Sequence, residues 1–504
     1  MLFANSIAQS SCRDGEVLTA RQLIADPFFA KVPYKFLLWQ EGLALRRRLR
    51  AGDVLCRQGD PGNTAYLIKS GRLLITASGN AQLRAECGPE HLIVGEMSCL
   101  SGKPRTADIT ATVDGEVWEI RRNVLDRVMR SPSMHERFEG IFRKYSLDAV
   151  LRDAELFRRL DPKAMGDCVE FLRPRLSFVR VNPGQTLFRQ NDPADSFYLV
   201  RMGHVAVEVQ TPGRKSKLLQ RGPGTSIGEI GLLGLSRQDM VMPVDKIDAA
   251  MDAAFAEASQ PITARWPASA RTATCSALDH LEMARISRKD FLEMVMTFPM
   301  LRRQLIGRSI QLLGADEVEA PAMRQYVEQG LYQGQSLLVL DLNKCTRCDE
   351  CTRACVQQHG SDSHGAPITR MLRQGLHFGD YLVATACRSC KDAYCMIGCP
   401  VDAIHRGKHQ QIVIEDHCIG CGLCEKNCPY GNIWMADNLR DQIDMPSADR
   451  PGATERVARP KAATCDLCDS EGKLDKPIPR CVYACPHDAA FRMSGEELLK
   501  KVTN

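Results

Sequence analysis

The sequence lacks a long apolar run: no stretch approaches 18 consecutive apolar residues. This absence excludes a transmembrane helix. The N-terminal segment, MLFANSIAQSSCRDGEV, also lacks a basic stretch followed by an apolar core, and it lacks a pair of arginines. Because such features mark exported proteins, we expect a cytoplasmic protein.

A large excess of one charge is missing too. The chain has 66 Lys and Arg against 61 Asp and Glu, a formal net charge of +5. This balance argues against a protein held to nucleic acid mainly by charge, so we expect no nucleic-acid partner. The length of 504 residues suggests about three domains, at roughly 100–200 residues each.

Cysteine, by contrast, is abundant. The chain contains 22 cysteines, and 16 of them fall between Cys345 and Cys485. A cytosolic protein does not normally keep so many thiols as disulfides, and clustered cytosolic cysteines indicate metal binding. The sequence therefore divides into a cysteine-poor N-terminal two-thirds and a metal-binding C-terminal third.

An internal repeat occupies the first two-thirds. The segment GDVLCRQGDP at 52–61 resembles GQTLFRQNDP at 184–193, which lies 132 residues later. This period is too long for a solenoid and indicates two copies of one domain. Short alternating segments, such as Ala65–Ile68 and Val205–Val209, lie between turn residues. They predict an antiparallel β-roll with helices at its ends.

Each copy contains a Gly-Glu pair and, further on, an Arg-Thr-Ala segment. These are Gly95, Glu96, Arg105, Thr106 and Ala107 in the first copy, and Gly228, Glu229, Arg271, Thr272 and Ala273 in the second. Glycine lets the backbone approach a ligand, and a helix start offers N–H groups to an anion. Arginine pairs with phosphate through two parallel hydrogen bonds. Together they suit a nucleotide with one phosphate charge.

On these residues, both copies resemble the cyclic-nucleotide-binding domains of the catabolite activator and of protein kinase regulatory subunits. The resemblance implies that Arg105 contacts the cyclic phosphate and that Glu96 contacts the ribose 2′-hydroxyl. The regulatory ligand would be cyclic AMP or cyclic GMP, and threonine at 106 and 272 favours cyclic GMP in some relatives. Because the second roll leads directly to the cysteine region, no segment remains for a DNA-binding helix-turn-helix.

The second copy departs from this pattern, because its arginine lies beyond an insertion of about 236–270. The insertion includes a predicted amphipathic helix over Asp245–Ala258, and it could deform or cover the second site. A broader alternative is that both rolls are relics kept for packing.

Four cysteine groups follow, and three of them end in Cys-Pro. They are Cys345, Cys348, Cys351 and Cys355; Cys387, Cys390, Cys395 and Cys399; Cys418, Cys421, Cys424 and Cys428; and Cys465, Cys468, Cys481 and Cys485. In such groups the closely spaced cysteines wrap one 4Fe–4S cluster, and the last reaches another. Zinc sites do not need the x3-Cys-Pro ending, so we favour iron–sulfur clusters over zinc. Apolar runs at Leu337–Leu340 and Ile412–Ile414 predict strands.

Residues of about 335–492 resemble the four-cluster subunit of the dimethyl sulfoxide reductase and formate dehydrogenase families. The resemblance implies that the groups exchange their fourth cysteines in pairs. The implied ligand sets are Cys387, Cys390, Cys395 and Cys428; Cys418, Cys421, Cys424 and Cys399; Cys345, Cys348, Cys351 and Cys485; and Cys465, Cys468, Cys481 and Cys355.

We therefore predict an α+β chain with two antiparallel β-roll (double-stranded β-helix) domains and flanking helices, over 16–152 and 153–315. A linker over 316–335 would lead into a tandem ferredoxin-like domain over 336–497 that holds four 4Fe–4S clusters.

The predicted function is electron transfer as a subunit of an oxidoreductase complex, regulated by cyclic nucleotide. No dinucleotide fingerprint, flavin motif or catalytic constellation is visible, so no catalytic residue is assigned. The partner would be a flavin-, molybdopterin- or hydrogenase-type catalytic subunit. The alternatives are a redox- and nucleotide-sensing signalling protein without such a partner, and a structural role for the clusters. An electron wire needs two accessible end clusters, whereas a sensor needs one labile cluster.

Overall fold

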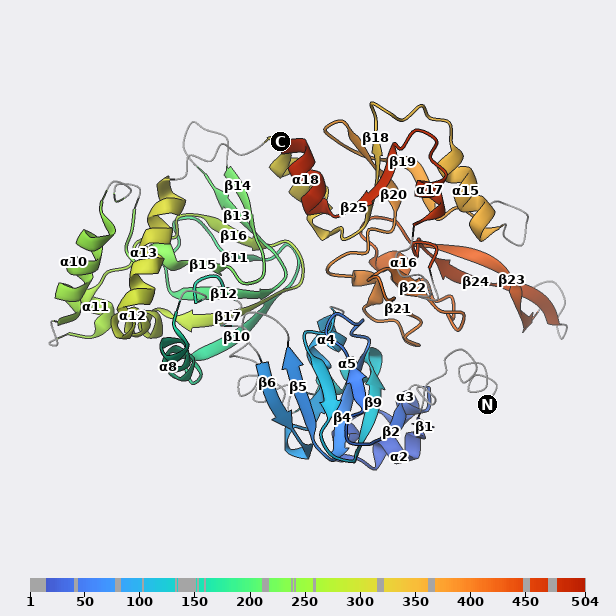
Figure 1. The fold of residues 1–504 in the computed structure, drawn as a ribbon, viewed down its shortest axis with the longest axis horizontal. Helices are drawn as coiled ribbons and strands as arrows, with labels where there is room; N and C mark the ends of the chain where they lie inside the picture. Colours follow the sequence, from blue (N-terminus) through green and yellow to red (C-terminus); the bar gives the residue numbers. More distant parts are fainter. Residues whose placement is uncertain are drawn as a thin grey trace. The chain divides into compact units, whose positions relative to one another are not determined.

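The chain divides into two compact units, Met1–His135 with Glu328–Asn504 and Glu136–Val327. The computed structural model (Figure 1) describes residues 15–39, 44–77, 83–101, 104–131, 134, 151, 154–157, 160–210, 217–236, 239, 242–256, 260–314, 321–360, 368–446, 454–469 and 478–503. None of the helices in these ranges is both long enough and apolar enough to cross a bilayer.

The first roll consists of two antiparallel sheets, with strand orders β1-β2-β9-β4-β7 and β3-β8-β5-β6. The strands are β1 (Glu16–Val17), β2 (Leu45–Leu49), β3 (Val54–Cys56), β4 (Thr64–Ser70), β5 (Leu73–Ala77), β6 (Leu83–Cys87), β7 (Ile93–Val94), β8 (Asp108–Ala111) and β9 (Gly115–Arg121). Its helices are α2 (Ala20–Ile24), α3 (Tyr34–Trp39), α4 (Glu96–Ser101) and α5 (Arg122–Met129). Side chains from both sheets, including Tyr66, Leu73 and Val117, form the core between them.

The second roll repeats this topology. Its sheets have the orders β10-β17-β12-β15 and β11-β16-β13-β14, which match β2-β9-β4-β7 and β3-β8-β5-β6 strand for strand. The strands are β10 (Leu176–Val181), β11 (Thr186–Phe188), β12 (Ser196–Met202), β13 (Val205–Val209), β14 (Lys217–Arg221), β15 (Ser226–Ile227), β16 (Thr274–Ala277) and β17 (Leu281–Ser287). The two predicted antiparallel rolls are thus confirmed.

Helices of the second unit pack around its roll. They are α8 (Pro162–Leu172), α9 (Glu229–Leu232), α10 (Val244–Ala256), α11 (Ile262–Arg265), α12 (Arg288–Thr297) and α13 (Pro299–Gly314). Helix α10 confirms the helix predicted in the insertion. Its buried residues Ile247, Met251 and Phe255 belong to the same core as Phe291 and Leu305 of α12 and α13. The insertion therefore adds a layer to the helical side of this unit.

The C-terminal third is built on a sheet of order β19-β20-β18-β25, accompanied by two hairpins. The strands are β18 (Leu337–Asp341), β19 (Met371–Phe378), β20 (Tyr381–Ala386), β21 (Ile404–Arg406), β22 (Ile412–Ile414), β23 (Trp434–Pro446), β24 (Thr454–Ala463) and β25 (Ala490–Met493). The helices are α15 (Glu350–His359), α16 (Leu423–Asn427), α17 (Arg480–Tyr483) and α18 (Gly495–Thr503), and α14 (Pro321–Glu328) is the last helix of the second unit. Strands β18 and β22 confirm the two strands predicted from apolar runs, and α14 lies in the stretch predicted as a linker.

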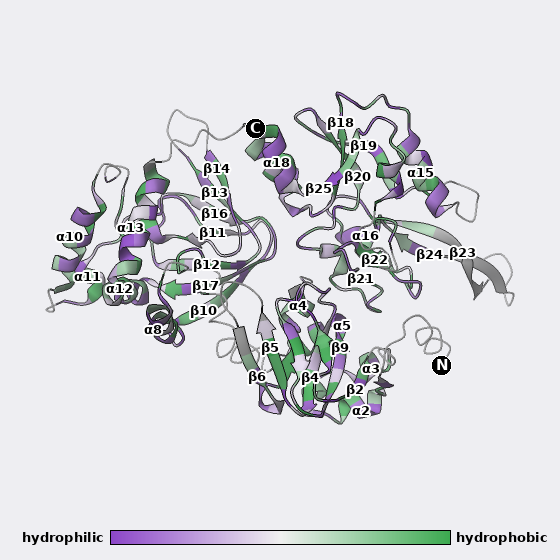
Figure 2. Cartoon of the chain, in the orientation of Figure 1, coloured by the Kyte–Doolittle hydropathy of each residue, from purple (hydrophilic) through white to green (hydrophobic). Residues whose placement is uncertain are grey.

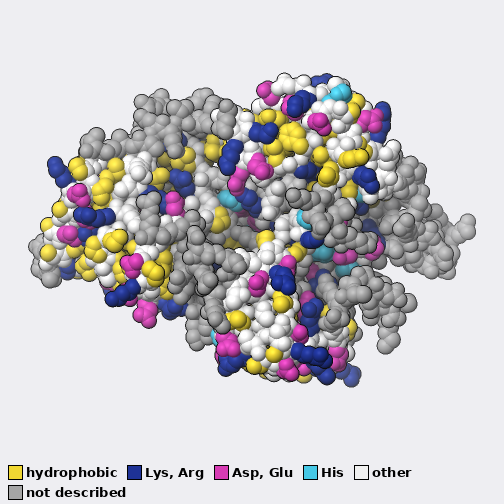
Figure 3. Space-filling view, viewed as in Figure 1, with side chains coloured by type: hydrophobic (Ala, Val, Ile, Leu, Met, Phe, Trp, Pro, Cys, Tyr) yellow, Lys and Arg dark blue, Asp and Glu magenta, His cyan; other side chains and the backbone are white. Residues whose placement is uncertain are grey.

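The distribution of polarity matches this architecture. Helix α18 has hydrophobic and hydrophilic residues in close succession (Figure 2), and its Leu498 is buried. On the face drawn in Figure 3, basic and acidic side chains are intermingled among the described residues. This mixture agrees with the nearly balanced composition of the sequence.

Candidate functional sites

The cysteine loops share an unusual backbone conformation. The residue before the second cysteine of every group has a positive φ: 63° at Arg347, 50° at Ser389, 69° at Gly420 and 60° at Leu467. For a residue other than glycine, such a conformation costs about 1–3 kcal/mol and persists only where the surroundings impose it. The four loops therefore share one conformation, which is strained at Arg347, Ser389 and Leu467, as expected of a chain that wraps a ligand.

The three Cys-Pro sequences form one recurring turn. The third residue after the cysteine has a positive φ in each: 51° at Asp402, 62° at Gly431 and 48° at Asp488. The next backbone N–H then donates to the cysteine sulfur. The donors are Ala403 to Cys399 at 3.3 Å, Asn432 to Cys428 at 3.4 Å, and Ala489 to Cys485 at 3.3 Å. Such bonds favour the charged thiolate, the form that binds metal.

Group one lacks this proline, and its last cysteine is held differently. Cys351 and Cys355 both lie on α15, one turn apart and about 6 Å along the axis. The N–H that reaches the Cys355 sulfur, at 3.1 Å, comes from the distant Arg370. Helix α15 can therefore present its two cysteines to two different centres.

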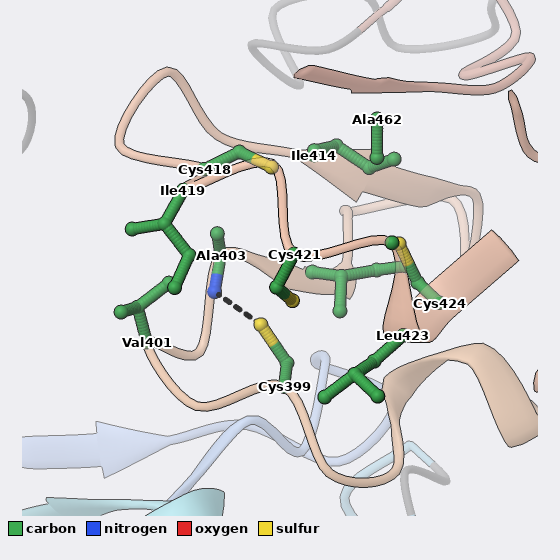
Figure 4. A pocket seen from close by; sticks show the side chains of 12 residues that line it. Cys399, Val401, Ala403, Ile414, Cys418, Ile419, Cys421, Leu423, Cys424 and Ala462 are labelled. Carbon is green, nitrogen blue, oxygen red and sulfur yellow. Dashed lines mark hydrogen bonds between the residues drawn. The ribbon is translucent and has the colours of Figure 1, made fainter. Parts of the chain in front are cut away.

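One pocket is surrounded by four cysteines from groups two and three. Cys399, Cys418, Cys421 and Cys424 line about 340 Å³ of empty space, together with apolar side chains such as Val401 and Leu423 (Figure 4). Cys421 is exposed, whereas Cys418 is buried. This set of thiols therefore reaches the surface of the molecule.

A second pocket joins groups one and four. Cys345, Cys348, Cys351 and Cys485 line about 320 Å³ of empty space. The pairing of β18 with β25, Leu340 opposite Ala490, brings the Cys485 turn next to the loop of the first group. Cys348 is exposed, so this set also reaches the surface.

The remaining eight cysteines form two interior sets. Burial raises the pKa of Cys395 well above its ordinary value, and the neighbouring Cys387, Cys390 and Cys428 raise it further. Burial likewise raises the pKa of Cys481 to about 12; Arg492 opposes this rise, whereas nearby Cys465, Cys355 and Cys468 add to it. The structure thus brings together the thiols of all four sets that the resemblance implied.

Burial at this level has a chemical consequence for these thiols. The pKa of Cys387 rises to about 11 and that of Cys390 to about 12, chiefly through desolvation. The isolated thiols would be neutral at pH 7, whereas a coordinating metal deprotonates them outright. The residues therefore fit a cationic iron centre that offsets the cost of buried thiolates.

The geometry of the sets also bears on the zinc alternative. Among the described residues, no three Cys, His, Asp or Glu side chains converge closely enough to hold a single metal ion. A zinc ion would need four ligands within about 2.0–2.3 Å of one point.

Buried arginines lie between and beside the sets, and the sequence reasoning missed them. Arg492 donates to the Cys387 carbonyl at 3.2 Å and to the Cys465 sulfur at 3.2 Å, so it links the two interior sets. Arg406, which is 1% exposed, donates to the Cys390 carbonyl at 2.5 Å. No local spacing marks these residues, because their partners lie 16 to 105 positions away in sequence.

In the first roll, Arg105 is fixed behind the Gly95-Glu96 pair. Its side chain is 4% exposed and donates to the Gly95 carbonyl at 2.9 Å, to the Thr64 carbonyl at 2.7 Å and to the Thr64 hydroxyl at 3.1 Å. Its buried Nε has no hydrogen-bond partner. Gly95 has a φ of 77°, and a Cβ there would lie 2.5 Å from Nη1 of Arg105. The arginine thus has a donor left for an anion.

The second roll reproduces this arrangement despite its insertion. Arg271 is 2% exposed, donates to the Gly228 carbonyl at 3.2 Å and has a buried Nε without a partner. In both copies the arginine backbone bonds twice to the preceding turn, Arg105 to Gly59 and Asp60 and Arg271 to Asn191 and Asp192. A difference is that Nη2 of Arg271 donates to Asp195 at 2.9 Å.

The other predicted nucleotide residues surround these arginines. Glu96 begins α4, and Glu229, which is buried, begins α9. Ala107 and Ala273 are buried, whereas Thr106 is exposed and Thr272 is partly buried. The insertion leaves the arginine in place, because its last residues are anchored locally: Trp266 donates to the Leu233 carbonyl at 2.9 Å.

The comparisons with known proteins agree with these two kinds of site. The family model of the cyclic nucleotide-binding domain matches residues 46–131 and 178–244, and that of the 4Fe-4S binding domain matches residues 412–434. The electron transport protein HydN of Escherichia coli K12 is 35% identical over 165 residues, which are 32% of this chain and 89% of HydN. The chain belongs to the family of iron–sulfur electron-transport proteins.

Two other relatives were found for this chain. The arsenate respiratory reductase iron-sulfur subunit ArrB of a Shewanella species is 30% identical over 187 residues, 30% of this chain and 78% of ArrB. The cAMP-dependent protein kinase regulatory subunit of Dictyostelium discoideum is 28% identical over 195 residues, 36% of this chain and 55% of that protein. The predicted fusion of cyclic-nucleotide-binding domains with a ferredoxin-type domain is thus confirmed.

Proposed function

We propose that this chain is the electron-transfer subunit of an oxidoreductase complex, that it carries four 4Fe–4S clusters in a row, and that cyclic nucleotide regulates it. The observation that carries this proposal is the placement of the four thiol sets. Each proposed cluster takes the ligands of one set, and a tandem ferredoxin-like arrangement follows from the exchange of fourth cysteines between groups.

The order of the clusters follows from the contacts between sets. Helix α15 connects the set of Cys351 with the set of Cys355. Arg492 connects the set of Cys465 with that of Cys387. On α16, Cys424 lies one turn before Cys428, the last residue of the neighbouring set. The row therefore begins at the exposed Cys348 and ends at the exposed Cys421, with the two interior sets between them.

Two exposed ends favour a wire over a sensor, because electrons must enter from one partner and leave to another. When bound, the clusters supply one-electron transfer and no bond chemistry. The chain's own residues hold the thiolates, exclude water from the interior sets and place positive charge beside them through Arg406 and Arg492.

The catalytic chemistry would therefore lie on a partner subunit of the flavin, molybdopterin or hydrogenase type. The relatives support this assignment by analogy: HydN is named an electron transport protein, and ArrB an iron–sulfur subunit of a reductase. We propose a similar assembly here.

For the rolls, we propose binding of cyclic AMP or cyclic GMP at both sites. Arg105 and Arg271 would each donate to the cyclic phosphate, and Glu96 and Glu229 would accept from the ribose 2′-hydroxyl. The placement of each arginine beside its Gly-Glu pair supports this assignment, since Arg105 donates to the Gly95 carbonyl and Arg271 to the Gly228 carbonyl.

The direct test is co-purification of the full chain from its native cell under anaerobic conditions, followed by a redox titration monitored by electron paramagnetic resonance. We expect a bound oxidoreductase subunit and several interacting clusters that its substrate reduces or oxidises. A single labile cluster without a bound partner or an electron acceptor would contradict the wire and favour the signalling alternative.

A further inference from the structure

The first roll carries a surface that contacts the iron–sulfur region within the same compact unit. Arg121 pairs with Asp402 at 3.1 Å, and the two side chains are only 9% and 7% exposed. Asn123 donates to the Pro400 carbonyl at 3.3 Å. Asn63 donates to the Arg406 carbonyl at 2.9 Å and accepts from the Arg406 N–H at 3.3 Å. We call Pro400–Arg406 the contact segment.

The contact segment belongs to an end of the proposed cluster row. It begins directly after Cys399, and Asp402 is the positive-φ residue of that Cys-Pro turn. The Cys399 thiol lines the pocket with Cys418, Cys421 and Cys424. A movement of this segment would therefore change the surroundings of the end set that contains the exposed Cys421.

The same surface adjoins the first nucleotide site through one residue, Thr64. The carbonyl and hydroxyl of Thr64 hold Nη2 of Arg105. Asn63 precedes Thr64 in the chain, and Arg121 lies opposite Thr64 in the pairing of β4 with β9. Two of the three contact residues are therefore direct neighbours of the group that restrains the phosphate-binding arginine.

The second roll has the matching backbone but not the contact residues. Asp195 stands at the position of Asn63, and Ser287 stands opposite Ser196 as Arg121 stands opposite Thr64. Asp195 pairs with Arg271, and Ser287 instead caps the start of α12. The contact is thus specific to the first copy, as expected if that copy alone acts on the end cluster.

We propose that cyclic nucleotide at the first site controls the position of the contact segment beside the end cluster through Thr64, Asn63 and Arg121, a mechanism that rests on the nucleotide binding proposed above. A phosphate that accepts two parallel hydrogen bonds, from Nε and from Nη2 of Arg105, competes with Thr64 for Nη2. When Thr64 is released, its neighbours Asn63 and Arg121 become more mobile. Their interactions with the contact segment are then weakened. Nucleotide thereby changes the surroundings of the end cluster, where a redox partner would bind.

Linkage gives this mechanism a sharp test, because breaking the contact must strengthen nucleotide binding by the same factor by which nucleotide weakens the contact. Asp402→Asn removes the charge that pairs with Arg121 and leaves the roll unaltered. Asp488→Asn is the matched control: Asp488 occupies the same position of the Cys485 turn and is exposed. Asn123→Ala changes the roll instead and removes the hydrogen bond to the Pro400 carbonyl.

The affinity for cyclic AMP and cyclic GMP is measured by titration calorimetry on the iron-loaded full chain. All variants also carry Arg271→Ala, so that the binding heat comes from the first site alone. We expect Asp402→Asn and Asn123→Ala to tighten binding at least about fivefold, and Asp488→Asn to leave it unchanged. Binding with equal affinity in all variants would overturn this inference alone. Absence of binding heat in every variant would overturn both the inference and the proposed nucleotide regulation.

Discussion

Arg492 donates a hydrogen bond to the sulfur of Cys465 across 3.2 Å. The guanidinium also donates to the carbonyl of Cys387, and the residue is partly buried. The pKa of Arg492 is raised; burial opposes this rise, and the nearby Cys465, Cys481 and Cys387 produce it. A permanent positive charge therefore lies at the junction of the two interior thiol sets.

Arg492→Gln should make the reduction potentials of both interior clusters more negative. Reduction adds negative charge, and the variant removes the nearby positive charge that favours it. The potentials are read from a redox titration followed by electron paramagnetic resonance, with Arg492→Lys as the control that keeps a positive charge. Unchanged potentials in Arg492→Gln, at full iron content, would show that this arginine is only a packing residue.

Cys428→Ser should damage the cluster of group two rather than that of group three. The sulfur of Cys428 lies with Cys387, Cys390 and Cys395, although its sequence neighbours belong to group three. Iron content should fall, and the signal of the cluster held by Cys387, Cys390 and Cys395 should be lost. Loss of the cluster at Cys418, Cys421 and Cys424 instead would mean that each group holds its own cluster.

Arg105→Ala should weaken cyclic-nucleotide binding at the first site by about 1.5–3 kcal/mol, or roughly 10–150-fold. The variant removes a charged donor whose buried Nε has no partner within the protein. Calorimetry on the full chain measures this loss, and Arg271→Ala serves as a matched variant of the second site. Undiminished affinity in the variant that carries both Arg105→Ala and Arg271→Ala would mean that the nucleotide binds outside these two sites. The rolls would then serve only in packing.

Asp248→Asn should destabilise the second roll by about 1–3 kcal/mol, because Arg302 loses its buried carboxylate partner and keeps only the exposed Asp252. The Asp248 pKa is lowered: burial opposes the shift, and hydrogen bonds from Arg302 and Arg303 outweigh it. The pair therefore stabilises the fold fully above about pH 4, and this stability is lost as the pH falls through the lower folded pKa.

Urea unfolding followed by Trp266 fluorescence, with the other three tryptophans changed to Phe, tests this pair locally. Trp266 packs against Phe255 of α10, next to the ion pair. Asp245→Asn is the control, since its pair with Arg303 is solvent-exposed and should contribute much less to stability. Equal effects of the two variants, or an unaltered acid dependence in Asp248→Asn, would contradict this account.

The sequence predicts well those parts of the fold that depend on residues close together in the chain. The repeated GDP and NDP turns and the Gly-Glu pairs led to two rolls with equivalent sheets. Arg271 could be recognised across the insertion because its Arg-Thr-Ala segment repeats that of Arg105. The apolar runs before groups one and three likewise appear as β18 and β22.

Contacts between distant segments could not be predicted in this way. Nothing in the neighbourhood of Asn63 indicates that it bonds to Arg406, 343 residues later. Burial of Arg302 in an ion pair with the insertion depends on how α10 packs against α13, which hydrophobic periodicity leaves undetermined. Such side chains acquire their roles only after the local elements have assembled.

The central claim, four clusters held by sixteen thiolates, is tested most directly by metal and sulfide analysis of the anaerobically reconstituted full chain. The account predicts about 16 iron and 16 acid-labile sulfide per chain, and negligible zinc. Stoichiometric zinc with little iron, or iron and sulfide for only one cluster in fully folded protein, would contradict it.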